Sequence, residues 1–264
     1  MALLRGAPPS LSARPSLSAR ALIINADDLG YEPAITRGIL RAMREGVVSS
    51  ATFMVNTPYS EEAARQAGGL SIGLHLNLAR GSPVWPGFPR NFLVDGAFSE
   101  PLAPTLPVEV VEAETRAQLE RLSALLGQLA THVDVHRHLH QHSNVLTGVA
   151  RAARAAGLPV RSIHEAMRRE LQAQGVATNA HFVGESGAEA YWTLERFEAV
   201  LAALPPTGVT ELMCHPGYRP EMFKGSYAAQ REVELDTFLH ARAREALARA
   251  GLTPTGFGAL TAGR

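Results

Sequence analysis

From residue 21 to its end, the 264-residue chain alternates short apolar segments with longer stretches whose apolar residues recur at helical spacing. The apolar segments, which we predict to be strands, are residues 21–25, 47–55, 70–78, 132–140, 159–163, 180–183 and 209–214. The predicted helices are residues 33–44, 61–67, 108–129, 144–156, 193–203 and 228–250. Such alternation is typical of a parallel sheet with helices outside it. About seven strand–helix units favour an α/β fold with a single TIM-like (β/α) barrel.

The composition excludes several kinds of partner and site. Lys+Arg and Asp+Glu both number 25, so the formal net charge is zero, and we expect neither nucleic acid nor an acidic membrane surface as a partner. No apolar run approaches the ~18 residues of a transmembrane helix. The one cysteine, Cys214, excludes an intrachain disulfide and a thiolate-built metal site, and we expect it to be buried in the core.

The first 20 residues differ in composition from the rest of the chain. They are rich in Pro, Ser, Ala and Arg and contain no acidic residue, as transit peptides also do. A disordered extension is the simpler interpretation, because the segment has no continuous apolar core of a secretory signal. We therefore expect a cytoplasmic protein in which residues 21–264 form one barrel domain.

Acidic and imidazole side chains fall at or near several predicted strands. Asp27 and Asp28 follow the first strand, His75 lies in the third, and His215 follows the last. In a barrel of parallel strands, the carboxyl ends converge on one mouth, so these side chains should meet there. They are the ligands of a divalent metal and the groups needed for proton transfer. The side chains of the adjacent aspartates should diverge, so that one can bind metal while the other faces water.

Five of the ten histidines lie between residues 132 and 142. They alternate with Val and Leu, which predicts a strand with the histidines on one face. At ~3.3 Å per residue such a run is far longer than one metal sphere, so only close neighbours can share an ion. On spacing alone, His136 and His138 can chelate together. We expect His132 and His142, at the ends of the run, to lie at the surface.

Five sequence motifs occur in a specific order: ADDLG, GVVSSATFMVN, IGLHLNL with GSPV, HVDVHRHLH and ELMCHPGY. Together they resemble the YdjC-like carbohydrate deacetylase family, which is related in mechanism to the NodB-type polysaccharide deacetylases. The resemblance runs from about residue 22 to the last predicted helix. It implies a (β/α) barrel that is often distorted or incomplete. It also implies a hydrolase that removes the acetyl group from an N-acetylated sugar with a divalent metal, and a homodimer.

The resemblance assigns the metal ligands to Asp28, His75 and His136. Two imidazoles with a carboxylate suit zinc, cobalt or nickel, whereas the family resemblance brings in magnesium. The chain departs from the family at Arg137, where histidine is common. Because alternation places Arg137 on the other face of the predicted strand, we expect it to leave the metal unaffected.

The resemblance also implies roles around the metal. Asp27 would be the catalytic base and His215 the general acid. His138 and His140 would line the site, and Arg161 would contact the substrate or orient Asp27.

Two other functions remain open from the residues. Metal phosphoesterases also use clusters of aspartate and histidine at a barrel mouth, and a sugar-binding protein could keep the scaffold without turnover. The presence of all five predicted metal and catalytic residues counts against a loss of activity. Trp85 and Phe88, in the long segment 79–107, could stack on a sugar ring, or they could simply pack the loop.

Overall fold

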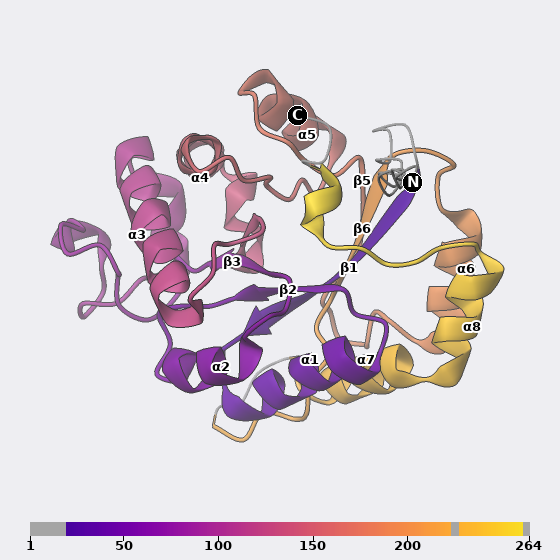
Figure 1. Cartoon of the computed structure of the whole chain (residues 1–264). Helices are drawn as coiled ribbons and strands as arrows, with labels where there is room; N and C mark the ends of the chain where they lie inside the picture. The colour runs from indigo at the N-terminus through magenta and orange to yellow at the C-terminus, as the bar shows by residue number, and fades with distance from the viewer. Residues whose placement is uncertain (1–19, 223–226, 261–264) are drawn as a thin grey trace, which may run out of the picture.

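The computed structural model describes residues 20–222 and 227–260, in which six parallel strands form one sheet. The strands are β1 (Ala21–Leu29), β2 (Ser50–Phe53), β3 (Ile72–Leu76), β4 (Val133–Val135), β5 (His181–Val183) and β6 (Val209–Cys214). Their order across the sheet is β4-β3-β2-β1-β6-β5, so β1 lies in the middle (Figure 1). The first and last strands along the chain, β1 and β6, are thus neighbours, as in a barrel.

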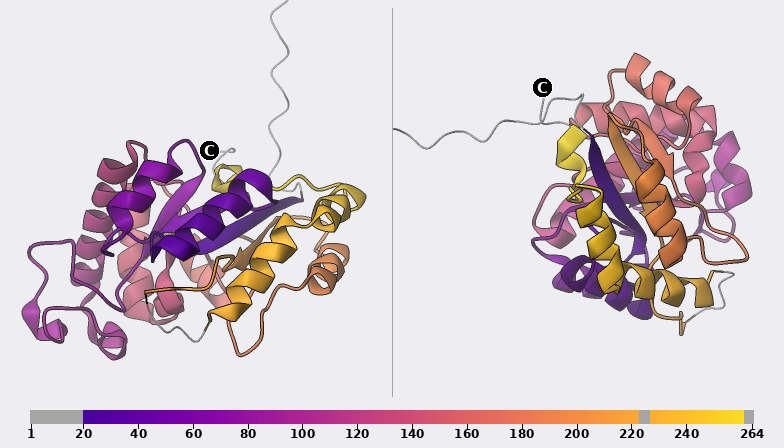
Figure 2. Two further views of the ribbon diagram at one scale, coloured as in Figure 1. Left: turned by 90° about the horizontal axis from the view of Figure 1, so that it is seen from below. Right: turned by 90° about the vertical axis from the view of Figure 1, so that its right-hand side faces the viewer.

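The helices lie outside the sheet and enclose it from several sides (Figure 2). They are α1 (Pro33–Glu45), α2 (Ser60–Ala67), α3 (Val108–Leu126), α4 (Ser143–Ala155), α5 (Glu165–Ala173), α6 (Leu194–Ala203), α7 (Ala229–Leu239) and α8 (Ala241–Arg249). Helices α1 and α7 lie side by side below β1 (Figure 1), although about 190 residues separate them along the chain. None of the helices in the described part is long and apolar enough to cross a membrane.

Regular strand pairing stops at β4 and β5, and the barrel is therefore incomplete. Backbone hydrogen bonds still span the gap. The N–H of Val133 donates to the carbonyl of Pro159 and the N–H of Arg161 to the carbonyl of Val133, both at 3.0 Å. The N–H of Val160 then donates to the carbonyl of Ala177 at 2.9 Å. The predicted α/β barrel is confirmed in this distorted form.

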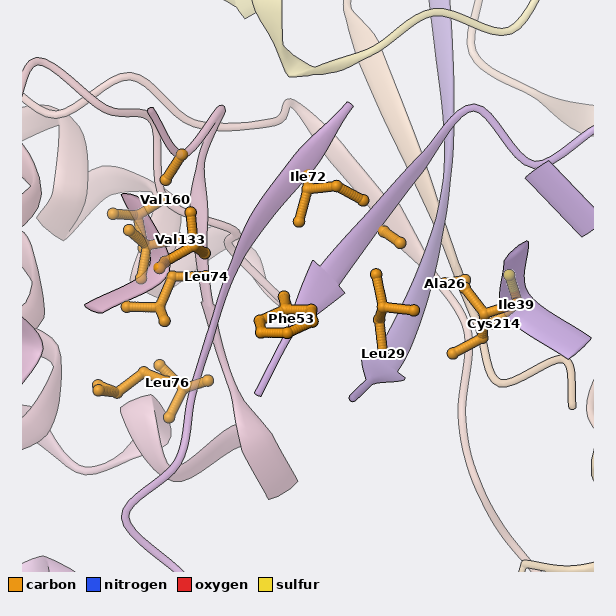
Figure 3. Packing of buried hydrophobic residues seen from close by; sticks show 14 of the residues in the cluster. Ala26, Leu29, Ile39, Phe53, Ile72, Leu74, Leu76, Val133, Val160 and Cys214 are labelled. Carbon is orange, nitrogen blue, oxygen red and sulfur yellow. The ribbon is translucent and has the colours of Figure 1, made fainter. Parts of the chain in front are cut away.

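The two faces of the strands carry different side chains. Leu29, Phe53, Leu74 and Val133 come from four neighbouring strands and lie in a row among the buried apolar residues (Figure 3). Side chains alternate between faces along a strand, so the residues next to these point into the barrel. Thr52, His75 and Asp134 are such neighbours, and the barrel therefore has a buried polar interior near the carboxyl ends of β2, β3 and β4.

The histidine run differs from the prediction. Strand β4 ends at Val135, and residues 136–141 form a 3-10 turn in which Arg137 and His138 have φ angles of 57° and 53°. The predicted strand 132–140 is therefore wrong beyond Val135. Two consecutive left-handed residues remove the alternation of faces on which the strand interpretation depended.

Three further elements differ. The predicted strand 209–214 is present with the same ends, and the other predicted strands and helices are present with shifted ends. Residues 159–163 form only an isolated bridge, Val133 to Val160, rather than a strand. The predicted helix 228–250 divides at His240, whose ring accepts a hydrogen bond from the N–H of Arg242 and caps α8. Helix α5 was not predicted, and His164 caps it in the same way. In both places a histidine ring caps the helix that follows, a role that residue type alone does not reveal.

Two expectations concern other parts of the chain. Cys214 is fully buried, as predicted. The predicted extension of residues 1–20 falls almost wholly outside the described residues.

We predict that Gly38→Ala destabilises the fold. A Cβ at this position of α1 would lie 2.5 Å from Cα of Gly217 and 2.8 Å from the backbone nitrogen of Tyr218. Overpacking costs about 1–3 kcal/mol, and the better helix propensity of alanine offsets up to about 1 kcal/mol, so we expect a net loss of about 1–2 kcal/mol in the free energy of unfolding. Urea denaturation measures it. In the matched control Gly68→Ala the added Cβ meets nothing within 4 Å, so the midpoint should stay within error. An unchanged midpoint for Gly38→Ala would show that α1 does not closely contact the backbone at Gly217 and Tyr218.

Candidate active site

A cavity of about 330 Å³ opens at the carboxyl end of the strands. Six of the eight predicted site residues line it: Asp27, Asp28, His75, His136, His138 and His215. The other two, Arg161 and His140, are fully buried and do not belong to the lining. Further lining residues include Tyr31, Arg80, Arg137, Ser186, Met213, Tyr227 and Arg231.

Three ligand atoms converge in this cavity. Asp28 Oδ1 lies 3.3 Å from His75 Nε2 and 3.2 Å from His136 Nδ1, and the two ring nitrogens are 3.1 Å apart. Atoms that bind one ion at about 2.1 Å have this spacing when the angles between them are about 100°. Asp28 Oδ1 is buried and has no hydrogen-bond partner in the described part of the chain. The three residues therefore fit a divalent metal ion at this point.

A local irregularity of β1 separates the two aspartates. The register with β2 shifts between Ala26 and Leu29, and Asp28 has a φ of 73°. Aspartate tolerates this left-handed conformation better than most residues do. As a result Asp28 turns toward the two histidines, while Asp27 points to other partners, and the side chains diverge as expected.

A second carboxylate orients the ring of His75. Asp134 Oδ1 lies 2.6 Å from Nδ1 of His75, and Asp134 Oδ2 accepts a hydrogen bond from the hydroxyl of Thr52 at 2.9 Å. With the Nδ1 proton directed at this carboxylate, a neutral ring offers its Nε2 lone pair to a metal. Burial opposes the charged ring, but Asp134 and the neighbouring aspartates raise the pKa of His75 to about 10. Binding of an ion at Nε2 must then displace a proton.

Arg161 holds Asp27 with two hydrogen bonds. Its Nη1 and Nη2 lie 2.7 Å from Oδ2 and Oδ1 of the carboxylate. The same guanidinium contacts Asp134 Oδ2 at 2.8 Å and Glu211 Oε1 at 2.7 Å. Burial opposes the charge, yet Arg161 holds the pKa of Asp27 well below its usual range. Of the two roles expected for Arg161, these contacts favour the orientation of Asp27.

His215 follows β6 on the opposite side of β1 from His75. Its backbone N–H donates to Glu234 Oε2 at 2.5 Å, and its ring centroid lies 5.4 Å from that of Tyr227. Ring atom Nδ1 has no partner in the described residues. Burial lowers the pKa of His215 to about 4, although Asp28 and Asp27 oppose this shift. The free ring is therefore neutral at neutral pH.

The remaining histidines of the run separate in the structure. His138 lines the cavity, with its ring 5.8 Å from that of the buried His140. The surface position expected for His132 is wrong: the side chain is fully buried, its ring stacks on that of Phe257 with centroids 3.4 Å apart, and it does not belong to the cavity lining. His142, by contrast, is partly exposed.

Arg137 also departs from the prediction. It lines the cavity instead of facing away, because its left-handed backbone redirects the side chain. Its Nε lies 2.5 Å from Oε2 of Glu100, in the long segment between β3 and α3. Trp85 and Phe88, in the same segment, pack against each other and do not belong to the cavity lining.

Sequence reasoning missed several residues that support the site. Asp134 stands inside the HVDVH motif, so its position in a strand next to His75 was a usable signal. Arg231, in α7, lies 2.5 Å from Asp28 Oδ2, and Glu234 is one turn further along the same helix. No motif marks either residue of α7, and only their contacts with Asp28 and with the backbone of His215 reveal them.

Comparison with known proteins gives a consistent assignment. The profile of the family described as YdjC-like protein matches residues 21–249. A carbohydrate deacetylase of Brevibacillus brevis is 37% identical over 227 residues, which cover 81% of this chain and 89% of the relative. A chitooligosaccharide deacetylase of Serratia marcescens is 35% identical over 248 residues, covering 88% and 96%.

Solved structures agree with the fold. A proposed cellobiose-phosphate cleavage protein of Enterococcus faecalis superimposes with a TM-score of 0.81 at 27% identity, over 92% of this chain and 99% of that one. A CE4 domain of a xylanase from a termite hindgut metagenome has a TM-score of 0.50 at 12% identity, and shows likeness of fold alone. The profile match over most of the sequence, with relatives more than 30% identical, shows that this chain belongs to the YdjC-like family.

Proposed function

We propose that this protein is a metal-dependent carbohydrate deacetylase, which hydrolyses the N-acetyl group of a sugar or oligosaccharide to acetate and a free amino sugar. One observation carries the proposal: Asp28, His75 and His136 present three ligand atoms within 3.3 Å of one another, in the cavity that Asp27 and His215 also line. The deacetylase names of the relatives supply the reaction class.

The metal would be held by Asp28, His75 and His136. A bound divalent ion supplies Lewis acidity, which polarises the acetyl carbonyl and makes a water molecule more acidic. Two imidazoles with one carboxylate suit zinc, cobalt or nickel, and magnesium remains a candidate from the family resemblance. Asp134 keeps the Nε2 lone pair of His75 available, and Arg231 fixes the second oxygen of Asp28.

Asp27 and His215 would move the protons. Asp27 stays ionised because Arg161 stabilises its charge, so it can accept the proton of the attacking water. As a weak base it takes that proton only as the water becomes acidic during attack. The leaving nitrogen needs one proton before the C–N bond breaks, and His215 would donate it. Since the free ring is neutral, it must gain that proton in each turnover, and its source would be the one proton that the attacking water gives to Asp27. His138, in the same lining, would contact the sugar.

We predict that activity is lost on removal of the metal. After dialysis against a chelator, with loss of metal checked by elemental analysis, acetate release from N-acetylglucosamine and its oligomers should fall to background. Addition of zinc, cobalt, nickel or magnesium one at a time should restore it for at least one ion. Full activity in the verified metal-free protein would refute the metal-dependent mechanism. Release of phosphate, but not acetate, from a panel of phosphorylated and acetylated sugars would favour a phosphoesterase. Sugar binding without any turnover would favour a binding protein.

Substitution of each aspartate by asparagine tests their different roles. Asp27→Asn should reduce kcat by about 10²–10⁴-fold, the usual contribution of a general base, while calorimetric titration with zinc shows little change in affinity. Arg161 keeps Asp134 and Glu211 as partners in this variant, so the fold should persist. Asp28→Asn is the matched change in the neighbouring residue and should weaken zinc binding instead. If Asp27→Asn abolishes zinc binding, the roles of the two aspartates are assigned wrongly.

A further inference from the structure

Helix α7 carries a fully buried carboxylate, Glu234, behind the wall of the cavity. Its Oε2 accepts a hydrogen bond from the backbone N–H of His215 at 2.5 Å. Its Oε1 accepts one from the hydroxyl of Tyr227 at 2.5 Å and a longer one from the N–H of Trp192 at 3.4 Å. Both oxygens are thus used, and each serves a different segment.

Two of these donors belong to residues that line the cavity. The rings of His215 and Tyr227 meet edge to face with centroids 5.4 Å apart. The Tyr227 hydroxyl also accepts a hydrogen bond from the N–H of Tyr191 at 3.0 Å, which fixes the phenol from its other side. Glu234 therefore sets the backbone of His215 and the position of the ring against which the imidazole packs.

The imidazole has few other constraints. Its Nδ1 has no hydrogen-bond partner in the described part of the chain, so the ring is held by its packing against Tyr227 and not by a hydrogen bond at this atom. The backbone after it is tied to the same helix, since the N–H of Gly217 donates to the carbonyl of Arg231 at 3.1 Å. The direction of the ring thus depends on α7, through Glu234 at His215 and through Arg231 at Gly217.

We propose that Glu234 is a positioning residue for proton donation: it fixes His215, directly and through Tyr227, so that the imidazole faces the nitrogen that leaves the acetyl group. This inference rests on the proposed deacetylase function and on His215 as the acid. It is distinct from the role of Arg231, one turn earlier in α7, whose side chain contacts the metal ligand Asp28.

The substitution Glu234→Gln tests the inference without a change of size. An amide has one acceptor oxygen. If that oxygen accepts from the N–H of His215, the NH2 group faces the N–H of Trp192, which is a fixed donor, and the Tyr227 hydroxyl, which must turn its own proton away and accept instead. We expect kcat for deacetylation of an N-acetylglucosamine oligomer to fall about 10-fold, with KM and zinc affinity nearly unchanged. Glu232→Gln, on the same helix but half-exposed, is the control and should retain wild-type kcat.

A double-mutant cycle shows whether Glu234 acts through His215. We expect Glu234→Gln to cost about 10-fold in the wild-type background but less than about 2-fold in a His215→Ala background, because the group it positions is gone. Equal losses in both backgrounds would overturn the inference and leave Glu234 a structural residue.

A second substrate gives an independent readout. 4-Nitrophenyl acetate loses a phenolate that needs no proton, so Glu234→Gln should affect its hydrolysis far less than it affects the sugar amide. A similar loss for both substrates, or a drop in zinc affinity, would also overturn the inference. Failure of the proposed function looks different: the wild-type protein itself would then release no acetate from the N-acetyl sugars.

Discussion

The site depends on the ion pairs that the buried guanidinium of Arg161 makes with three carboxylates. The guanidinium contacts Asp27 from β1, Asp134 from β4 and Glu211 from β6, at distances of 2.6–2.8 Å. Three carboxylates at the centre of a barrel would repel one another strongly without a cation between them. Arg161 has no regular strand of its own, and its backbone bonds to Val133 place it in the gap between β4 and β5. The gap in the barrel therefore supplies the positive charge that stabilises the buried carboxylates of the paired strands.

Arg161 also positions the proposed metal ligands indirectly, through Asp134. Asp134, held by Arg161 and Thr52, orients His75, and His75 presents Nε2 toward Asp28 and His136. On the other side of β1, helix α7 supplies the supports for Asp28 and His215. Of the proposed metal ligands, His75 and His136 thus depend on β3 and β4, whereas Asp28, in β1, depends on α7. The proposed acid, which follows β6, depends on α7 as well. Asp27, His75 and His215 are each hydrogen-bonded to a buried residue outside the cavity lining, namely Arg161, Asp134 and Glu234.

The sequence predicts which segments form strands and which residues approach the barrel mouth, because both follow from local patterns. Asp27, Asp28, His75 and His215 stand at strand ends, and parallel strands deliver their ends to one edge. The histidine run misled the prediction because its alternation matches a strand, whereas two left-handed residues, Arg137 and His138, turn the chain out of the sheet. Arginine gives no local signal for that conformation, and histidine gives only a weak one. Arg231 and Glu234 also escaped, since their significance depends on how α7 packs and not on its sequence.

The charges of the buried groups give an independent reason to expect a cation in this cavity. Asp27, Asp28, Asp134 and Glu211 are each no more than 3% exposed, and the arginines that contact them are Arg161 and Arg231. With these six groups ionised and His75 neutral, four carboxylates face two guanidinium groups, which leaves two negative charges in a poorly solvated place. Such an excess is costly unless the cluster gains positive charge. The titration tendencies agree, because burial raises the pKa of Glu211 to about 7, and the acids around His75 outweigh its burial and raise its pKa to about 10. One divalent ion at Asp28, His75 and His136 would neutralise that excess and leave His75 free to bind as a neutral ring.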